Sequence, residues 1–280
     1  CVFIGRQAGY GVTTGSYNLA IGNESMQAAV TGTHNVCVGR DSLRAITSGN
    51  YNIALGNDTN RTCATAHNTI AIGHRALYSN TVGNVVAIGY KACEESTTGG
   101  QKVAIGYEAL RFATTGTGNT AVGNGALDTL TTGQKNTAVG ANCGGSSTTG
   151  DYNVLIGNTN GVALTTGWGN TYVGCTCANN ATDGVRNVAM GMHALDAMTT
   201  ASSNTSIGYN SGSSVTTGGG NTFLGRNAGD SVTTGSKNTC IGDETGDSIT
   251  TGSNNIVIGQ NAAASSATVS DEITLGKDDV

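Results

Sequence analysis

Three acidic residues recur at a spacing that could hold a metal ion. Glu24, Asp41 and Asp58 follow one another at intervals of 17 residues. If the chain returns to the same place every 17 residues, their carboxylates stack, and stacked carboxylate oxygens suit a hard cation such as Ca²⁺. The same series continues with Arg75 and Lys91, however. A solvated column of mixed charge explains the series better, so we predict no metal site and no cofactor.

Carboxylate pairs of the kind that cleave polysaccharides are a second possibility. The acidic pairs Glu94–Glu95, Asp271–Glu272 and Asp278–Asp279 are adjacent in sequence, and adjacent residues of a strand point to opposite faces. No Ser/His/Asp grouping is visible. The four histidines occupy four different positions of the repeat: His34, His67, His74 and His193. We therefore predict no catalytic residues and no enzymatic activity.

Tyrosines offer a weaker binding signal. Tyr90 and Tyr107 occupy the same expected exposed position in adjacent repeats, and Tyr17, Tyr51 and Tyr152 share another. Flat aromatic faces can stack on sugar rings, which makes Tyr90 and Tyr107 glycan-contact candidates. Ordinary turn tyrosines are the alternative explanation.

All of these residues must be positioned by one repeat that covers residues 1–280. Each copy contains an aliphatic residue followed by a glycine, which we call the corner glycine. Successive corner glycines are 17 residues apart, except for one step of 16 between Gly73 and Gly89. The corner glycines are Gly5, Gly22, Gly39, Gly56, Gly73, Gly89, Gly106, Gly123, Gly140, Gly157, Gly174, Gly191, Gly208, Gly225, Gly242, Gly259 and Gly276. We expect a single repetitive domain of 17 coils, and because the sequence opens within a repeat, a fragment of a longer fibre protein.

The columns of the repeat predict its structure. The residue before each corner glycine is aliphatic, and the residue three before it is Val, Ile, Leu or Thr, a period-two pattern of β-branched residues typical of a strand. One coil cannot bury its own apolar face, whereas stacked coils can. We therefore expect an all-β, parallel β-solenoid with coils of about 17 residues, assembled as an intertwined or side-by-side homotrimer, with a dimer as the alternative.

Asparagine stands four residues before the corner glycine in twelve of the seventeen copies. Stacked amides can hydrogen-bond to the coils above and below, so we expect a structural ladder at this ladder column. Its asparagines are Asn18, Asn35, Asn52, Asn119, Asn136, Asn153, Asn170, Asn187, Asn204, Asn221, Asn238 and Asn255.

Small residues stand two before the corner glycine in most copies, in what we call the alanine column, and they suggest self-assembly. The column contains no charge, and we expect it to face away from the coil interior and to pack against partner chains. Its alanines are Ala20, Ala54, Ala71, Ala87, Ala104, Ala121, Ala138 and Ala189. On this interpretation Ala121→Glu would break assembly by burying a charge between chains.

The motif resembles a known class of repeats. The segments NTAVGNGAL (119–127), NTAVGANCG (136–144) and NTIAIGHRALYSNTVG (68–83) resemble the repeats of bacteriophage tail-fibre proteins and, more distantly, the head repeats of trimeric autotransporter adhesins. The end, SDEITLGKDDV (270–280), is similar to the segment that precedes a self-cleaving chaperone in phage fibres. The resemblance implies a trimeric fibre shaft at a virion or cell surface, with another region touching a glycan or protein receptor.

Composition narrows the alternatives. The net charge is −5 with no basic stripe, which disfavours nucleic acid, and no apolar run approaches the ~20 residues of a membrane span. The eight cysteines lack metal-ligand spacing, so we interpret them as small apolar residues. Threonines come as adjacent pairs rather than outward T-x-T pairs, which disfavours ice binding. An extracellular filament assembled end to end remains the alternative to a fibre shaft.

Overall fold

The computed structural model describes residues 1–276, so Asp278–Asp279 and the end of the segment 270–280 lie outside the described residues. The chain divides into two compact units, Cys1–Ala141 and Asn142–Val280. Every regular element among the described residues is a short β-strand, and no helix occurs there. Both units are therefore all-β and use the same coil, as the repeat predicts; one domain over 1–280 stays a prediction.

Unit 1 contains the strands β1 to β9. Their bounds are Val2–Ile4, Leu19–Ile21, Val36–Val38, Ile53–Leu55, Thr69–Ile72, Val85–Ile88, Lys102–Ile105, Thr120–Val122 and Thr137–Val139. Unit 2 contains the strands β10 to β17. Their bounds are Val154–Ile156, Thr171–Val173, Val188–Met190, Thr205–Ile207, Thr222–Leu224, Thr239–Ile241, Ile256–Ile258 and Ile273–Leu275.

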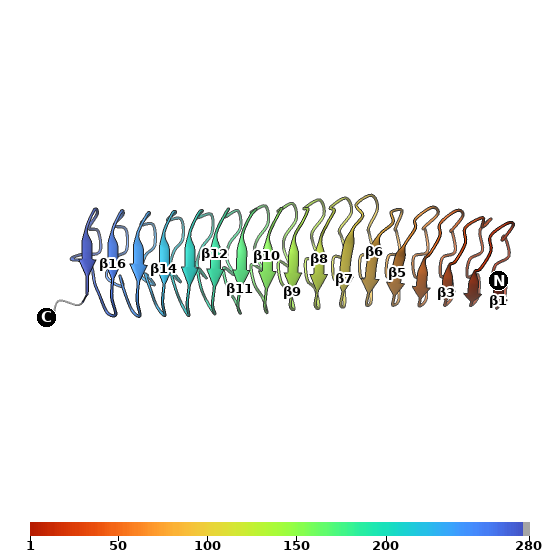
Figure 1. Ribbon diagram of the computed structural model, residues 1–280, viewed down its shortest axis with the longest axis horizontal. Coiled ribbons are helices and arrows are strands. Elements are labelled where there is room, and N and C mark those ends of the chain that lie inside the picture. The colour runs from red at the N-terminus through yellow and green to blue at the C-terminus, as the bar shows by residue number, and fades with distance from the viewer. Residues whose placement is uncertain (277–280) are drawn as a thin grey trace. The chain divides into compact units, whose positions relative to one another are not determined.

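Within each unit, consecutive strands pair in parallel, and each residue lies beside its equivalent in the next repeat. In unit 2, for example, Thr171 pairs with Val188 and Tyr172 with Ala189. Figure 1 shows the strands of each unit side by side, each followed by a segment that loops back to the next strand. The predicted parallel β-solenoid is confirmed, and the nearly constant repeat length keeps its register, which the one 16-residue step does not break.

The corner glycine is required by both conformation and close approach. At Gly208 the backbone has φ of 142°, a conformation that side-chain-bearing residues rarely adopt. A Cβ at Gly208 would also overlap the carbonyl oxygen of the next corner glycine, Gly225. Any other residue at this position would separate neighbouring coils.

The T-T-G turns also stack, through the first threonine of each pair. Thr165 Oγ1 donates to the carbonyl of Thr182 at 3.2 Å, and Thr216 repeats this contact with Thr233 at 3.3 Å. The second threonine is exposed, as at Thr166 and Thr217. The two threonines thus point in different directions, as expected for adjacent residues.

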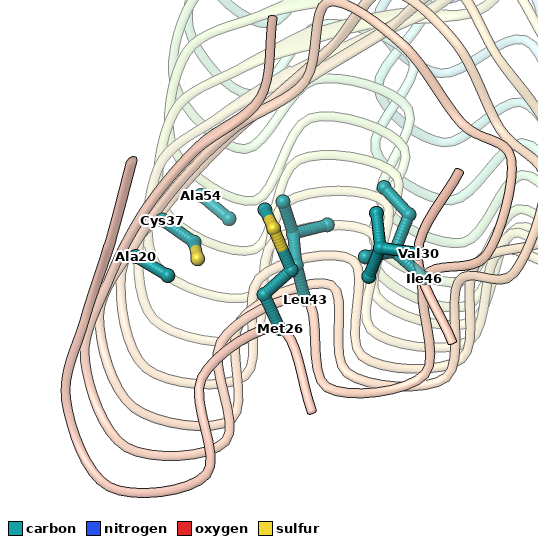
Figure 2. Close-up of a cluster of buried hydrophobic side chains, with 7 residues drawn as sticks. All are labelled: Ala20, Met26, Val30, Cys37, Leu43, Ile46 and Ala54. Carbon is teal, nitrogen blue, oxygen red and sulfur yellow. The ribbon is translucent and has the colours of Figure 1, made fainter. Parts of the chain in front are cut away.

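The core lies inside the coil. Figure 2 shows Ala20, Cys37 and Ala54 on one wall, pointing towards Met26 and Leu43, while Val30 and Ile46 enter from the opposite end of the cross-section. All seven of these side chains are fully buried. The interior is narrow, so it is filled by one small and one or two medium-sized side chains per coil.

The asparagine ladder predicted from the sequence is present. Asn187 shows its repeating unit: its backbone N–H and Nδ2 both donate to Asn170 Oδ1, at 3.0 and 3.2 Å. Its Nδ2 also donates to the Ala201 carbonyl at 2.8 Å, and its Oδ1 accepts from the N–H and Nδ2 of Asn204. The amide is fully buried and satisfies backbone groups that no strand partner reaches.

We expect Asn187→Ala to destabilise unit 2 by about 2–4 kcal/mol, because it leaves several buried groups without a partner at ~1–3 kcal/mol each. Urea unfolding and hydrogen exchange of the amides near Asn204 would measure this. Asn158→Ala, at an exposed asparagine of the same unit, is the matched control and should stay within ~0.5 kcal/mol. Equal effects of the two substitutions would contradict a structural role for the ladder.

Candidate functional site

The alanine column faces the interior of the coil, so the expectation that it forms an interchain stripe is wrong. In a single chain its alanines are all fully buried: Ala20, Ala54, Ala71, Ala87, Ala104, Ala121, Ala138 and Ala189. The large members Tyr172 and Phe223 are fully buried too. A residue enclosed by its own coil cannot contact a partner chain.

The physical reason is the alternation of the strand. The alanine column and the ladder column are two residues apart, so they share a face. The ladder asparagines are buried, as at Asn119 and Asn187, and the alanine column follows them inward. Alternation alone predicts two faces but does not say which is inside; the position of the ladder decides it.

A second signal in the sequence identifies the same face. The residues four after the corner glycines form what we call the facing column. In a given coil, a small residue in the alanine column tends to be accompanied by a large residue in the facing column, and a large one by a small one. Ala121 is accompanied by Leu127, whereas Phe223 is accompanied by Gly229. A Cβ at Gly229 would overlap the ring of Phe223, so the two columns share one space. This compensation in side-chain volume is the signal that the sequence analysis missed.

The outward face of the sheet is uncharged and consists of aliphatic residues and threonines. It consists of two columns, one and three residues before the corner glycine, which we call the outer columns. None of their residues is charged. In unit 1, Ile53 and Ile105 are each 37% exposed. In unit 2, Leu224 is 46% and Ile256 38% exposed. Each unit therefore presents an uncharged strip of partly exposed aliphatic side chains.

The stacked carboxylates of unit 1 are neutralised by arginines. Glu24 pairs with Arg44 at 3.1 Å, and Asp58 pairs with Arg40 at 3.3 Å and with Arg61 at 3.6 Å. No cluster of three or more potential metal ligands occurs among residues 1–276. The three carboxylates thus belong to a column of mixed charge. Each faces a guanidinium group, and they do not converge on a common point.

The adjacent residues Glu94 and Glu95 lie in different environments. Glu94 is buried and bonds to Arg75 and Arg111, whereas Glu95 is exposed. Beside the charged column lies an open depression of about 570 Å³, lined in part by Tyr10, Arg44 and Arg61. Its guanidinium groups are already engaged by carboxylates of the same flank.

The two glycan-contact candidates stack on each other. The rings of Tyr90 and Tyr107 lie 5.0 Å apart at an angle of 15°, and His74 covers the other face of Tyr90 at 5.6 Å. A similar stack joins Tyr17, His34 and Tyr51. The faces of Tyr90 are thus occupied, which leaves ring edges and one face of Tyr107 for any ligand.

The ladder column changes its chemistry next to the shortened coil. Thr69, Val85 and Lys102 replace three successive asparagines. Thr69 continues the ladder, because its Oγ1 donates to Asn52 Oδ1 at 2.6 Å. Lys102 is 1% exposed, and its Nζ donates to Ser96 Oγ at 3.0 Å and to the Ala113 carbonyl at 2.6 Å. Burial lowers the pKa of this ammonium, whose two hydrogen-bond acceptors are a hydroxyl and a backbone carbonyl.

We expect Lys102→Asn to stabilise unit 1 at neutral pH by about 1–2 kcal/mol, because it removes a buried charge and lets an amide bond to Asn119. A lysine whose pKa is lowered in the folded state destabilises the folded protein once the pH falls below the ordinary lysine pKa of ~10.4. This destabilisation reaches its full size below the lowered pKa. Wild-type stability should therefore rise relative to Lys102→Asn as pH is raised from 8 towards 10. Urea unfolding across that pH range measures the difference in stability. The control Lys102→Met removes the charge without adding an amide, so it should lose the pH dependence but not gain the ladder hydrogen bond. A pH-independent difference between wild type and Lys102→Asn would contradict the assignment.

The cysteines are free thiols, six of them buried and two, Cys1 and Cys175, exposed. Burial raises the pKa of Cys37 to about 12 and that of Cys63 to about 11. Thiols with such pKa values are weak nucleophiles at neutral pH. The buried cysteines pack as small apolar residues.

In-register coils, an internal amide ladder and parallel strands together define the chain as a parallel β-solenoid repeat protein. No family model matches the chain, and comparison with curated proteins and with solved structures finds no match either. A search of the described residues finds no helix of the length and apolarity that a membrane crossing requires.

Proposed function

We propose that the chain is a structural shaft of a viral tail fibre or surface adhesin, which holds a receptor-binding region away from the particle or cell. The observation that carries the proposal is the uniformity of the coils. Within each unit every strand pairs with the next, most coils add the ladder and turn contacts, and the stacking adds one strand spacing of ~4.8 Å per coil. Such a stack gives length and stiffness.

The resemblance to phage tail-fibre and adhesin repeats supports the same proposal, as does the lack of a convergent set of titratable groups in the charged column of unit 1. On this proposal the chain lies outside the cell or on the virion, and its partners are other copies of itself, three in the finer form. Contact with a glycan or protein receptor is assigned to another region of the fibre.

Electron microscopy with antibodies against residues 1–276 tests the proposed location. We expect labelled fibres on the surface of the source particle or cell, with the label set back from the fibre tip. Label at the tip alone would favour a receptor-binding role. Label along continuous filaments that are detached from any particle would favour the end-to-end filament, and purely intracellular label would overturn both.

A further inference from the structure

The strongest unassigned feature is the uncharged outer face of the sheet. We propose that the outer columns form the contact between copies of this chain, with the copies running parallel. The inference rests on the proposed fibre shaft, and it moves self-association from the buried alanine column to the two columns on either side of it.

The composition of the outer columns favours a covering partner. The strand T-A-V at 120–122 is apolar on the inside at Ala121 and uncharged on the outside at Thr120 and Val122. Strands that are apolar on both faces are normally covered on both faces. An exposed, flat strip of aliphatic and threonine side chains, without one charge in either outer column, is a feature that soluble monomers avoid.

The area of the outer face is large enough for a stable interface. In unit 1, nine strands at ~4.8 Å spacing and three residues of ~3.3 Å give a strip of about 400 Å². Outward residues on either side, such as Tyr17 and Tyr107, widen the strip to about 800 Å², which is the area that each partner buries in a standard stable interface. The charge-free strip with tyrosines at its margins also matches the usual division into an apolar centre and a polar rim.

The constant spacing of the coils favours a second copy of the chain as the partner. Because the coils of every copy repeat at the same spacing, each coil can meet its equivalent at the same level. A second copy therefore fits this face along the whole unit, whereas a partner without the repeat would match it only locally.

The test uses two lysines on the strip. Ile53→Lys with Ile105→Lys places charges on exposed side chains of the outer face, and the matched control, Thr98→Lys with Thr115→Lys, places them on exposed turn threonines. We expect light scattering over a concentration series to show a fixed multiple-chain mass for wild type and control. For the outer-face variant we expect association weakened by at least about 100-fold, with unchanged β-sheet circular dichroism. An unchanged mass, or a monomeric wild type, would overturn the proposal.

A crosslinking measurement covers the case in which the lysine variant does not fold. In a Cys1→Ser, Cys175→Ser background, Val103→Cys with Ile105→Cys should form interchain disulfides under mild oxidation. Thr98→Cys with Thr115→Cys should not. The reverse pattern, or no interchain disulfide at either pair, contradicts the outer-face contact. Surface labelling of a fibre by antibody would still support the shaft in that case, so the two proposals fail separately.

Discussion

Ala121→Glu should unfold the coils around β8 rather than merely separate chains. Ala121 is fully buried and lies between Ala104 and Ala138 in register with the neighbouring strands. A carboxylate there has no charged partner in its own column, and burying an unpaired ion costs several kcal/mol even after relaxation. The longer side chain also overfills a narrow interior, which adds about 1–3 kcal/mol. The sum is a large part of the stability of a typical domain.

The adjacent residue provides a matched control. Val122 is only half-buried and faces outward, so Val122→Glu should keep the circular dichroism spectrum and the protection of unit 1 amides against hydrogen exchange. Ala121→Glu should lose that protection throughout residues 100–141. An intact coil stack in Ala121→Glu, with only the particle mass reduced, would restore the alanine column as an interchain stripe and refute the inward assignment.

The architecture could be predicted from the sequence because the repeat is long and regular. Seventeen corner glycines, spaced by 17 residues at every step but one, fix the register, and β-branched residues at alternate positions before them fix the strand. The ladder was predictable for the same reason: an amide that recurs at one position, as at Asn170 and Asn187, has an identical amide to bond with above and below. These are one-dimensional regularities that survive without knowledge of the cross-section.

The inside and outside of the strand were not predictable from apolar character, because both faces of segments such as TAV are uncharged. Small size was interpreted as close approach between chains, whereas it reflects a narrow interior opposite a leucine, as with Ala121 and Leu127. The stacking of Tyr90 on Tyr107 was missed for a related reason. A shared column was interpreted as two separate platforms, although a spacing near that of parallel strands places the rings on each other.

The size compensation between the two inner columns can be tested at Phe223 and Gly229. Phe223 is fully buried, and a Cβ at Gly212 would approach its ring at 2.6 Å, while one at Gly229 would overlap it. The ring therefore occupies the space that leucine fills in coils such as the one containing Ala189 and Leu195. Phe223→Ala should destabilise unit 2 by about 3–5 kcal/mol through lost burial and a cavity, and Gly229→Leu alone should destabilise it through overpacking.

Combined, Phe223→Ala and Gly229→Leu recreate the alanine–leucine pair, and the double variant should recover most of the loss. Leucine tolerates the backbone there, since Leu195 has φ of 52° at the equivalent position and Gly229 has 60°. Urea midpoints and amide protection between residues 205 and 250 give the four corners of a double-mutant cycle, with an expected coupling of about 2–3 kcal/mol. Phe112→Ala, at a partly exposed ring on the coil surface, should cost under ~1 kcal/mol and serves as the aromatic control. Additive effects at Phe223 and Gly229 would show that the two columns do not share one space, and the assignment of the inner face would then lose its strongest support from the sequence.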